Sequence, residues 1–139
     1  YVYLPLYSER LKEVSLKSGL NQCNAGGRAR DANEVYIPIP LSIHHDFPAF
    51  FPPRDTSFTL HLPNGSSMSA KICQDGGKAL MSNPNKELGK WLLRDVLHLK
   101  EGELLTMEKL NRFGFDSVII TKIDSENFKI DVRRRNENE

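Results

Sequence analysis

The 139-residue sequence predicts a single domain of mainly β structure, a small barrel of short strands joined by short helices. Three observations support this prediction. Short segments alternate apolar and polar residues, turn-forming residues separate these segments, and only brief stretches have helical spacing. A hydrophobic content of 39% in a chain of this length is enough for one core and too little for two.

The chain begins with a strand and a long loop. Residues 2–6 alternate in polarity, and Pro5 limits them to the edge of a sheet. Residues 18–34 contain almost no large apolar side chain, so we expect a loop, and loops of this length in a compact domain are usually functional or disordered. Their mixture of Asn, Gln, Arg and Asp differs from the Gly and Ser repeats of a flexible linker.

The middle of the chain contains the clearest strand signals. Residues 34–39 are predicted to form a strand, and Pro40 suits the first turn of a short helix. Residues 57–62 and 67–73 alternate on either side of Pro-Asn-Gly at 63–65, so we expect a hairpin. Three aromatic residues are expected to fill the core here: Phe47, Phe50 and Phe51.

The following segment predicts a strand and then a helix. A break at 75–77 precedes an expected strand at 78–81, and residues 82–85 can cap a helix. The apolar face of that helix follows a helical spacing: Leu88, Trp91, Leu92 and Val96.

The end of the chain predicts a strand at 103–106 and a short helix at 107–113 that stops at Gly114. Residues 117–123 and 127–132 should form a closing hairpin. We expect the domain to span residues 1–132 and the charged residues 133–139 to form a disordered tail.

Composition excludes several classes of protein. No apolar run approaches the roughly 18 residues that a membrane helix needs. Two cysteines do not make a disulfide scaffold, so a cytoplasmic protein is expected, and a zinc site built from Cys23, Cys73, His44 and His45 matches no known spacing. The sequence begins within a predicted strand and without an initiator methionine, so we expect a piece of a longer protein.

Charge is distributed unevenly despite a formal net charge of only +1. Residues 66–100 carry six basic and three acidic side chains, which favours a polyanionic partner. Acidic residues gather instead at Glu101, Glu103 and Glu108 and in the tail, where they would face away from that partner.

Catalytic motifs are not found in the sequence. No lysine follows an Asp or Glu by two positions, as one common metal-dependent nuclease core requires, and His98-Leu-Lys100 lacks the Asp that a phospholipase-D-like core needs. His98 is better explained as a histidine at a helix end. Neither Gly26-Gly27 nor Gly76-Gly77 has the spacing of a nucleotide-binding loop. We therefore predict no catalytic residue, metal or cofactor in this domain.

Two polar segments, 21–34 and 74–90, supply the side chains that read base edges in the major groove. Arg and Lys suit guanine, Asn and Gln suit adenine, and Asp and Glu suit the amino group of cytosine. The predicted base-reading residues are Gln22, Asn24, Arg28, Arg30, Asp31, Asn33, Glu34, Gln74, Asp75, Lys78, Ser82, Asn83, Asn85 and Lys86. The predicted contacts to the DNA backbone are Lys17, Ser18, Asn21, Gly27, Lys71, Gly77 and Lys90. Composition alone would favour two ordinary solvated loops.

Residues 19–40 resemble the N-terminal arm of NgoFVII-type restriction endonucleases. The similarity continues through residues 47–52, 58–65, 70–74, 77–86 and 88–94. The resemblance implies a B3-like seven-stranded open pseudobarrel, shared with plant transcription factors and with domains of EcoRII-like and BfiI-like enzymes. Trp91 followed by residues 99–102 is similar to the plant pattern.

The same resemblance implies a function. Two arms would grip the major groove of double-stranded DNA in a sequence-specific manner, and a phospholipase-D-like nuclease domain of the same polypeptide would cut it. The domain would thus be the target-recognition part of a type II-like restriction endonuclease. Two alternatives stay open: a domain that itself cleaves DNA, and a protein-interaction barrel that docks a partner subunit through the acidic segment 103–108.

Overall fold

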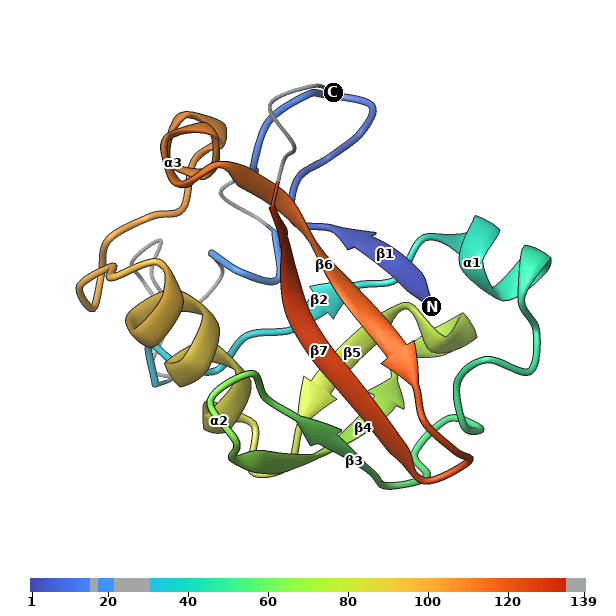
Figure 1. The fold of residues 1–139 in the computed structure, drawn as a ribbon. Helices are drawn as coiled ribbons and strands as arrows, with labels where there is room; N and C mark the ends of the chain where they lie inside the picture. Colours follow the sequence, from blue (N-terminus) through green and yellow to red (C-terminus); the bar gives the residue numbers. More distant parts are fainter. Residues whose placement is uncertain (16–17, 22–30, 135–139) are drawn as a thin grey trace.

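A computed structural model describes residues 1–15, 18–21 and 31–134, without the side chain of Arg134. In this part of the chain, seven strands form one sheet in the order β1-β6-β7-β3-β4-β5-β2 (Figure 1). Neighbouring strands are antiparallel except β3 and β7, which run parallel. The end strands β1 and β2 contact one another, so the sheet curls into a nearly closed barrel.

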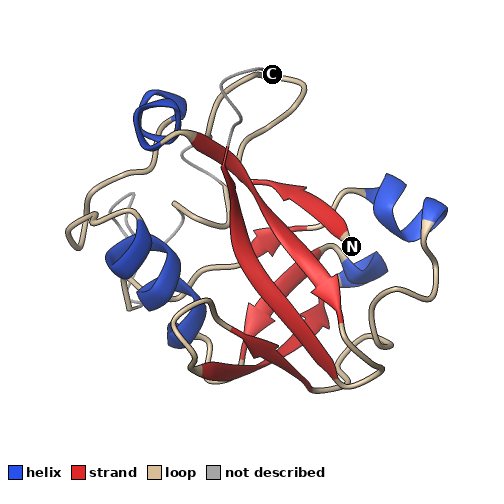
Figure 2. Ribbon diagram, viewed as in Figure 1, coloured by secondary structure: helices blue, strands red, loops and turns tan. Residues whose placement is uncertain are grey.

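The strands are short and helices connect them. The strands are β1 Val2–Pro5, β2 Ile37–Pro38, β3 Phe58–His61, β4 Ser67–Cys73, β5 Ala79–Ser82, β6 Phe115–Lys122 and β7 Asn127–Arg134. The helices are α1 Leu41–Asp46, the 3-10 turn η1 Asp75–Gly77, α2 Lys86–Gly89, the π-helix η2 Lys90–Val96 and α3 Met107–Phe113. Figure 2 shows α2 and α3 on one side of the barrel and α1 on the other.

Several elements confirm the sequence predictions. The β3–β4 hairpin pairs Phe58 with Ala70 and His61 with Ser67, around the predicted turn. Helix α3 begins where the Thr106 side chain accepts a hydrogen bond from the Lys109 amide at 3.2 Å. It ends at Gly114, whose φ of 85° is the left-handed conformation that suits glycine. The mainly β fold class is therefore correct.

Other expectations were wrong. Residues 103–106 form no strand, because the amide and carbonyl groups of Leu105 bond the Asn21 side chain. The strand expected at 34–39 shrinks to Ile37–Pro38, because the Glu34 and Tyr36 amides bond the carbonyls of Asp31 and Gly19 instead of a neighbouring strand. Phe47 is 50% exposed and is not a core residue.

The domain boundary expected after residue 132 was also placed too early. Strand β7 continues to Arg134 and pairs there with Phe115. The rest of the expected tail, residues 135–139, lies outside the described residues.

The core fills the inside of the barrel. Leu4, Leu60, Phe115 and Phe128 are fully buried, and burying each such side chain contributes roughly 1.5–3 kcal/mol. Burial alternates along β1 and β3, as expected for strands with one face toward the core. The helices that the structure describes include none long and apolar enough to cross a membrane.

Candidate nucleic-acid interface

Strand β5 divides the second polar segment into two loops. The turn 74–78 precedes the strand and the loop 83–85 follows it. Ser82, the last residue of β5, is 1% exposed, and its Oγ accepts a hydrogen bond from the Leu88 amide at 2.9 Å. Ser82 therefore supports the start of α2, and its predicted role in reading a base is wrong.

A hollow of about 520 Å³ lies between the two loops, on the outer face of β4 and β5. Lys71 and Met81 are partners in the β4–β5 ladder and share this face. Besides Ser82, four predicted contact residues line the hollow together: Lys71, Gln74, Asn83 and Asn85. The structure thus brings amide side chains from both loops next to one lysine.

The turn 74–78 has an unusual backbone. Gln74 has φ 69° and ψ 163°, a region that costs a residue with a side chain about 1–3 kcal/mol. Gly76 and Gly77 also have positive φ. The Gly77 amide donates to the Gln74 carbonyl at 3.0 Å, and Gly77 is buried. Because this amide is used inside the turn, the predicted phosphate contact of Gly77 is wrong.

The exposed side chains of this turn face solvent. Lys78 is exposed, and its carbonyl accepts from the Ile39 amide at 2.6 Å, which ties the turn to the chain after β2. Asp75 is 95% exposed, and its Oδ1 lies 3.4 Å from Nη1 of Arg54. Arg54 was not singled out from the sequence. An ion pair between two exposed side chains holds them only weakly.

Asn21, the first residue of the first polar segment, is buried and bonds protein groups. Asn21 is 1% exposed, and its amide group donates to the carbonyls of Ser15 and Leu105 and accepts from the Leu105 amide. The Ser18 Oγ is buried and has no hydrogen-bond partner among the residues that the structure describes. The Asn21 side chain is thus used inside the protein, so its predicted contact with the DNA backbone is wrong, whereas the contact of Ser18 stays a prediction.

Residues 31–34, at the other end of this segment, lie beside the loop after β5. Asp31 Oδ2 is 3.4 Å from Lys86 Nζ, and Asp31 Oδ1 accepts from the Asn33 amide at 2.8 Å. The hydrogen bond from the Asn33 amide, followed by Lys86, holds the pKa of Asp31 below its usual value. Glu34 is half-buried nearby. The two polar segments therefore meet at this end of β5.

Arg94 is a central residue here that the sequence did not identify as functional. It was counted only as one basic residue of a basic segment. Its Nε donates to Asn33 Oδ1 at 2.8 Å, and its Nη2 donates to the Ala32 carbonyl at 3.0 Å. Spacing could not reveal this contact, because 61 residues separate Arg94 from Asn33.

The remaining predicted contacts lie elsewhere. Lys90 lines a separate hollow beside the β3–β4 turn, together with Glu87 and Asp95. The other predicted residues lie outside the described part of the chain: Lys17, Gln22, Asn24, Gly27, Arg28 and Arg30.

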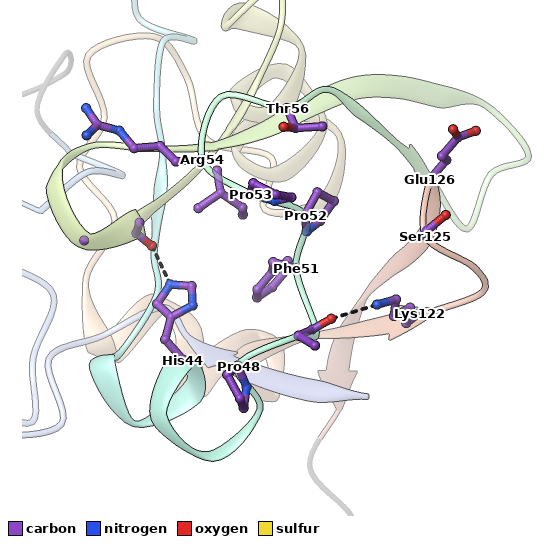
Figure 3. Close-up of a pocket in the computed structure, with 14 residues that line it drawn as sticks. His44, Pro48, Phe51, Pro52, Pro53, Arg54, Thr56, Lys122, Ser125 and Glu126 are labelled. Atoms are coloured by element: carbon purple, nitrogen blue, oxygen red, sulfur yellow. Dashed lines mark hydrogen bonds between the residues drawn. The ribbon is translucent and has the colours of Figure 1, made fainter.

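A larger hollow of about 740 Å³ lies on the other side of the turn 75–77 (Figure 3). Phe51 lines it, together with residues of α1 and of the β6–β7 turn. His44 Nε2 lies 2.7 Å from the Gly77 carbonyl oxygen, and Lys122 Nζ donates to the Ala49 carbonyl at 2.9 Å (Figure 3). These two polar side chains hold the walls of the hollow together.

The chemistry of the described residues offers little else. Within residues 1–15, 18–21 and 31–133, no three His, Cys, Asp or Glu side chains are grouped so that they could hold a metal ion. In the acidic segment, Glu103 pairs with Lys109 at 3.0 Å, and the Lys100 amide and Lys109 together lower the pKa of Glu103. Glu108 pairs with Arg112 at 3.3 Å. Local cations thus neutralise two of these carboxylates.

Comparison with known proteins identifies one family. Its model, described as the NgoFVII C-terminal B3-like DNA-binding domain, matches residues 6–124. No curated protein matches the chain. Among solved structures, that of a hypothetical Arabidopsis thaliana protein is similar, with 17% sequence identity and a TM-score of 0.40 over 76% of this chain and 81% of that one.

Proposed function

The chain belongs to the family of NgoFVII C-terminal B3-like DNA-binding domains, and on this premise we propose that it recognises a specific sequence of double-stranded DNA through the major groove. That it is a DNA-binding domain with a B3-like pseudobarrel follows from the family and the sheet. The observation that supports specific recognition is the hollow on β4 and β5, where Lys71, Gln74, Asn83 and Asn85 meet.

The chemistry of this hollow suits base edges. In the major groove, which is about 12 Å wide, each base pair presents a distinct pattern of donors and acceptors. Gln74, Asn83 and Asn85 each offer a donor and an acceptor, the pair that adenine requires. Lys71 and the exposed Lys78 would then bind guanine or position a phosphate.

The strained backbone of Gln74 favours a functional role for the turn. A residue is held in such a conformation only where the surrounding structure enforces it, and such residues cluster at ligand-binding sites. The conformation presents the Gln74 side chain at the rim of the hollow, where the side chain is exposed. We take Gln74 as the leading candidate for base reading.

A second prong is proposed in the first polar segment. Gln22, Asn24, Arg28 and Arg30 would supply its base contacts. Residues 31–34 contact the loop after β5 through Asp31 and Lys86, so the prong would start next to the hollow. The role of Asp31 changes in this scheme: its carboxylate binds Lys86 and the Asn33 amide, which positions Lys86 for DNA.

The proposal extends to the whole protein. The domain would direct a type II-like restriction endonuclease to its target, and a phospholipase-D-like domain of the same polypeptide would perform the cleavage. The catalytic step thus lies outside the 139 residues.

Two measurements on the purified chain test this proposal. Fluorescence anisotropy with a labelled duplex, selected from a random pool, should show competition by unlabelled selected duplex at least about 1000-fold better than by a scrambled duplex. Incubation with plasmid that contains the selected site, with and without magnesium, should leave it intact. Equal competition by both duplexes would refute specific recognition, and sustained nicking would refute the assignment of cleavage to another domain.

A further inference from the structure

We propose that Arg94 is a positioning residue that fixes the base of the first DNA-reading prong against the barrel. The inference rests on the proposed function. It adds to the proposed DNA contacts a residue that acts through the protein, because the Arg94 side chain bonds protein oxygens. Arg94 lies in η2, near the end of the helical segment that follows β5.

The contacts of Arg94 join two separate segments. On one side its guanidinium donates to Asn33 Oδ1 and to the Ala32 carbonyl. On the other side Nη1 donates to the carbonyls of Leu99 and Lys100 at 3.0 and 2.7 Å. A planar guanidinium presents its donors in a fixed fork, so these four bonds hold both segments in one relative position.

The π-helical geometry of η2 accompanies this arrangement. The Leu97 amide bonds the Leu92 carbonyl at 3.0 Å, five residues back, and the Leu99 amide bonds the Leu93 carbonyl at 2.8 Å. Just after these wide turns, the Leu99 and Lys100 carbonyls lie within hydrogen-bonding distance of Arg94 Nη1. π-Helical turns are rare and frequently occur at functional sites.

Close packing at Gly89 restricts the same segment independently. A Cβ atom at this position would overlap the carbonyl oxygen of Asn33 and lie 2.7 Å from its carbonyl carbon. The backbone at Asn33 therefore rests directly on α2. Together with the Asp31–Lys86 pair and the Arg94 bonds, this contact ties residues 31–34 to α2 and η2.

A consequence for recognition follows. Base contacts need prong residues placed to within a fraction of an ångström, whereas phosphate attraction tolerates displacement. Loss of Arg94 should then reduce discrimination between duplexes more than it reduces general affinity. Because Arg94 bonds protein oxygens, the number of phosphates contacted, and with it the salt dependence, should stay the same.

The test compares Arg94→Ala with a matched control, Arg112→Ala. Arg112 is 70% exposed and pairs only with Glu108, one turn away on α3, among the contacts described. Arg94→Ala should lower the affinity ratio of selected to scrambled duplex by about tenfold, with an unchanged salt slope. Arg94→Lys, which keeps the charge but loses the fork, should show an intermediate loss, and Arg112→Ala should bind as the wild type does.

Hydrogen exchange provides a readout that does not need DNA. In Arg94→Ala the amides of Asn33, Glu34 and Tyr36 should exchange about tenfold faster, while those of β6 and β7 stay protected. If Arg94→Ala does not fold, Arg94→Lys takes its place in both experiments.

The outcomes separate the two proposals. An unchanged affinity ratio in a folded variant overturns the positioning role. So does an equal loss for both duplexes with a smaller salt slope, which would make Arg94 a phosphate contact, and so does faster exchange throughout the barrel. If the wild-type chain binds every duplex alike, the proposed function is refuted instead. Hydrogen exchange at residues 31–36 then still tests the positioning role of Arg94.

Discussion

The two ends of β5 carry polar residues in different physical situations. At the Ser82 end, the side chains of Ser82, Asp31 and Asn33 are bonded to protein groups, while Asn83 and Asn85 line the hollow. At the Ala79 end, Gln74 and Lys78 are exposed, and their side chains make no hydrogen bond with the described part of the chain. The difference shows that a polar residue of these two segments can either bond protein groups or face solvent, and composition alone does not separate the two cases.

The largest effect should come from Asn21, whose side chain is buried and bonds protein groups. Asn21→Ala leaves the amide and carbonyl of Leu105 without their buried partner, so the free energy of unfolding should fall by about 3 kcal/mol. Denaturant unfolding measures this loss. Where the variant is folded, its preference for the selected duplex should equal that of the wild type. If Asn21→Ala is stable but has lost DNA binding, Asn21 contacts DNA and its role is not structural.

Lys78 is exposed, so its loss should weaken DNA binding and leave stability almost unchanged. Lys78→Ala should weaken binding of the selected duplex by about 1–3 kcal/mol, since one base or phosphate contact is lost. The midpoint of thermal unfolding should hardly change, because the side chain is exposed. Anisotropy titration and calorimetry check the two parts. Unaltered affinity would remove the turn 74–78 from the interface.

Gln74 should give effects of opposite sign in stability and binding. Gln74→Gly relieves the strained φ of 69° and should raise the free energy of unfolding by about 1 kcal/mol. It also removes the amide that would read a base, so affinity for the selected duplex should fall. Gln74→Ala provides the control, because it loses the amide but keeps the strain. A Gln74→Gly variant that is less stable than Gln74→Ala would contradict this account.

Ser82 supports α2 and should affect stability only modestly. Ser82→Ala removes the acceptor of the Leu88 amide and should cost about 1 kcal/mol of folding free energy. The preferred sequence of bound DNA should be the same as for the wild type. A changed preference would restore Ser82 as a base-reading residue.

The smallest effect concerns the ionisation of Asp31. The Asn33 amide, and then Lys86, lower its folded-state pKa below the usual 3.8. A depressed folded pKa means that the carboxylate stabilises the fold above the unfolded value and that this contribution is lost as pH falls through the folded value. NMR titration of the Asn33 amide should therefore show a midpoint below 3.8. Lys86→Gln should move that midpoint upward, and a midpoint at or above the usual value would contradict the contact.

Local patterns predicted much of the fold. The β3–β4 hairpin, α3 with its Gly114 end and the β6–β7 hairpin follow from turn residues and alternation close in sequence. The failures depend on distant partners: residues 103–106 lost their strand to Asn21, which lies 84 positions before Leu105. Phe47 was assigned to the core with Phe50 and Phe51 because all three are aromatic, but only Phe50 and Phe51 pack in the core.

The candidate site was predictable as a composition and not as a geometry. Gln74, Asn83 and Asn85 were named from their chemistry, and they line one hollow. Arg94 was missed, because its contacts cross from η2 to residues 32–33 and no local signal marks them. Residues that bond the protein and residues that face solvent have the same chemistry, so tertiary contacts are needed to distinguish them.

Selection of bound duplexes from a random pool tests the central claim most directly. The wild-type chain should enrich a single short sequence. The same selection with Gln74→Ala should return that sequence with one base pair no longer specified, and with Arg112→Ala it should return the sequence unchanged. A pool without any enriched sequence, or the same fully specified sequence with Gln74→Ala, would contradict base reading by Gln74 at the hollow on β4 and β5.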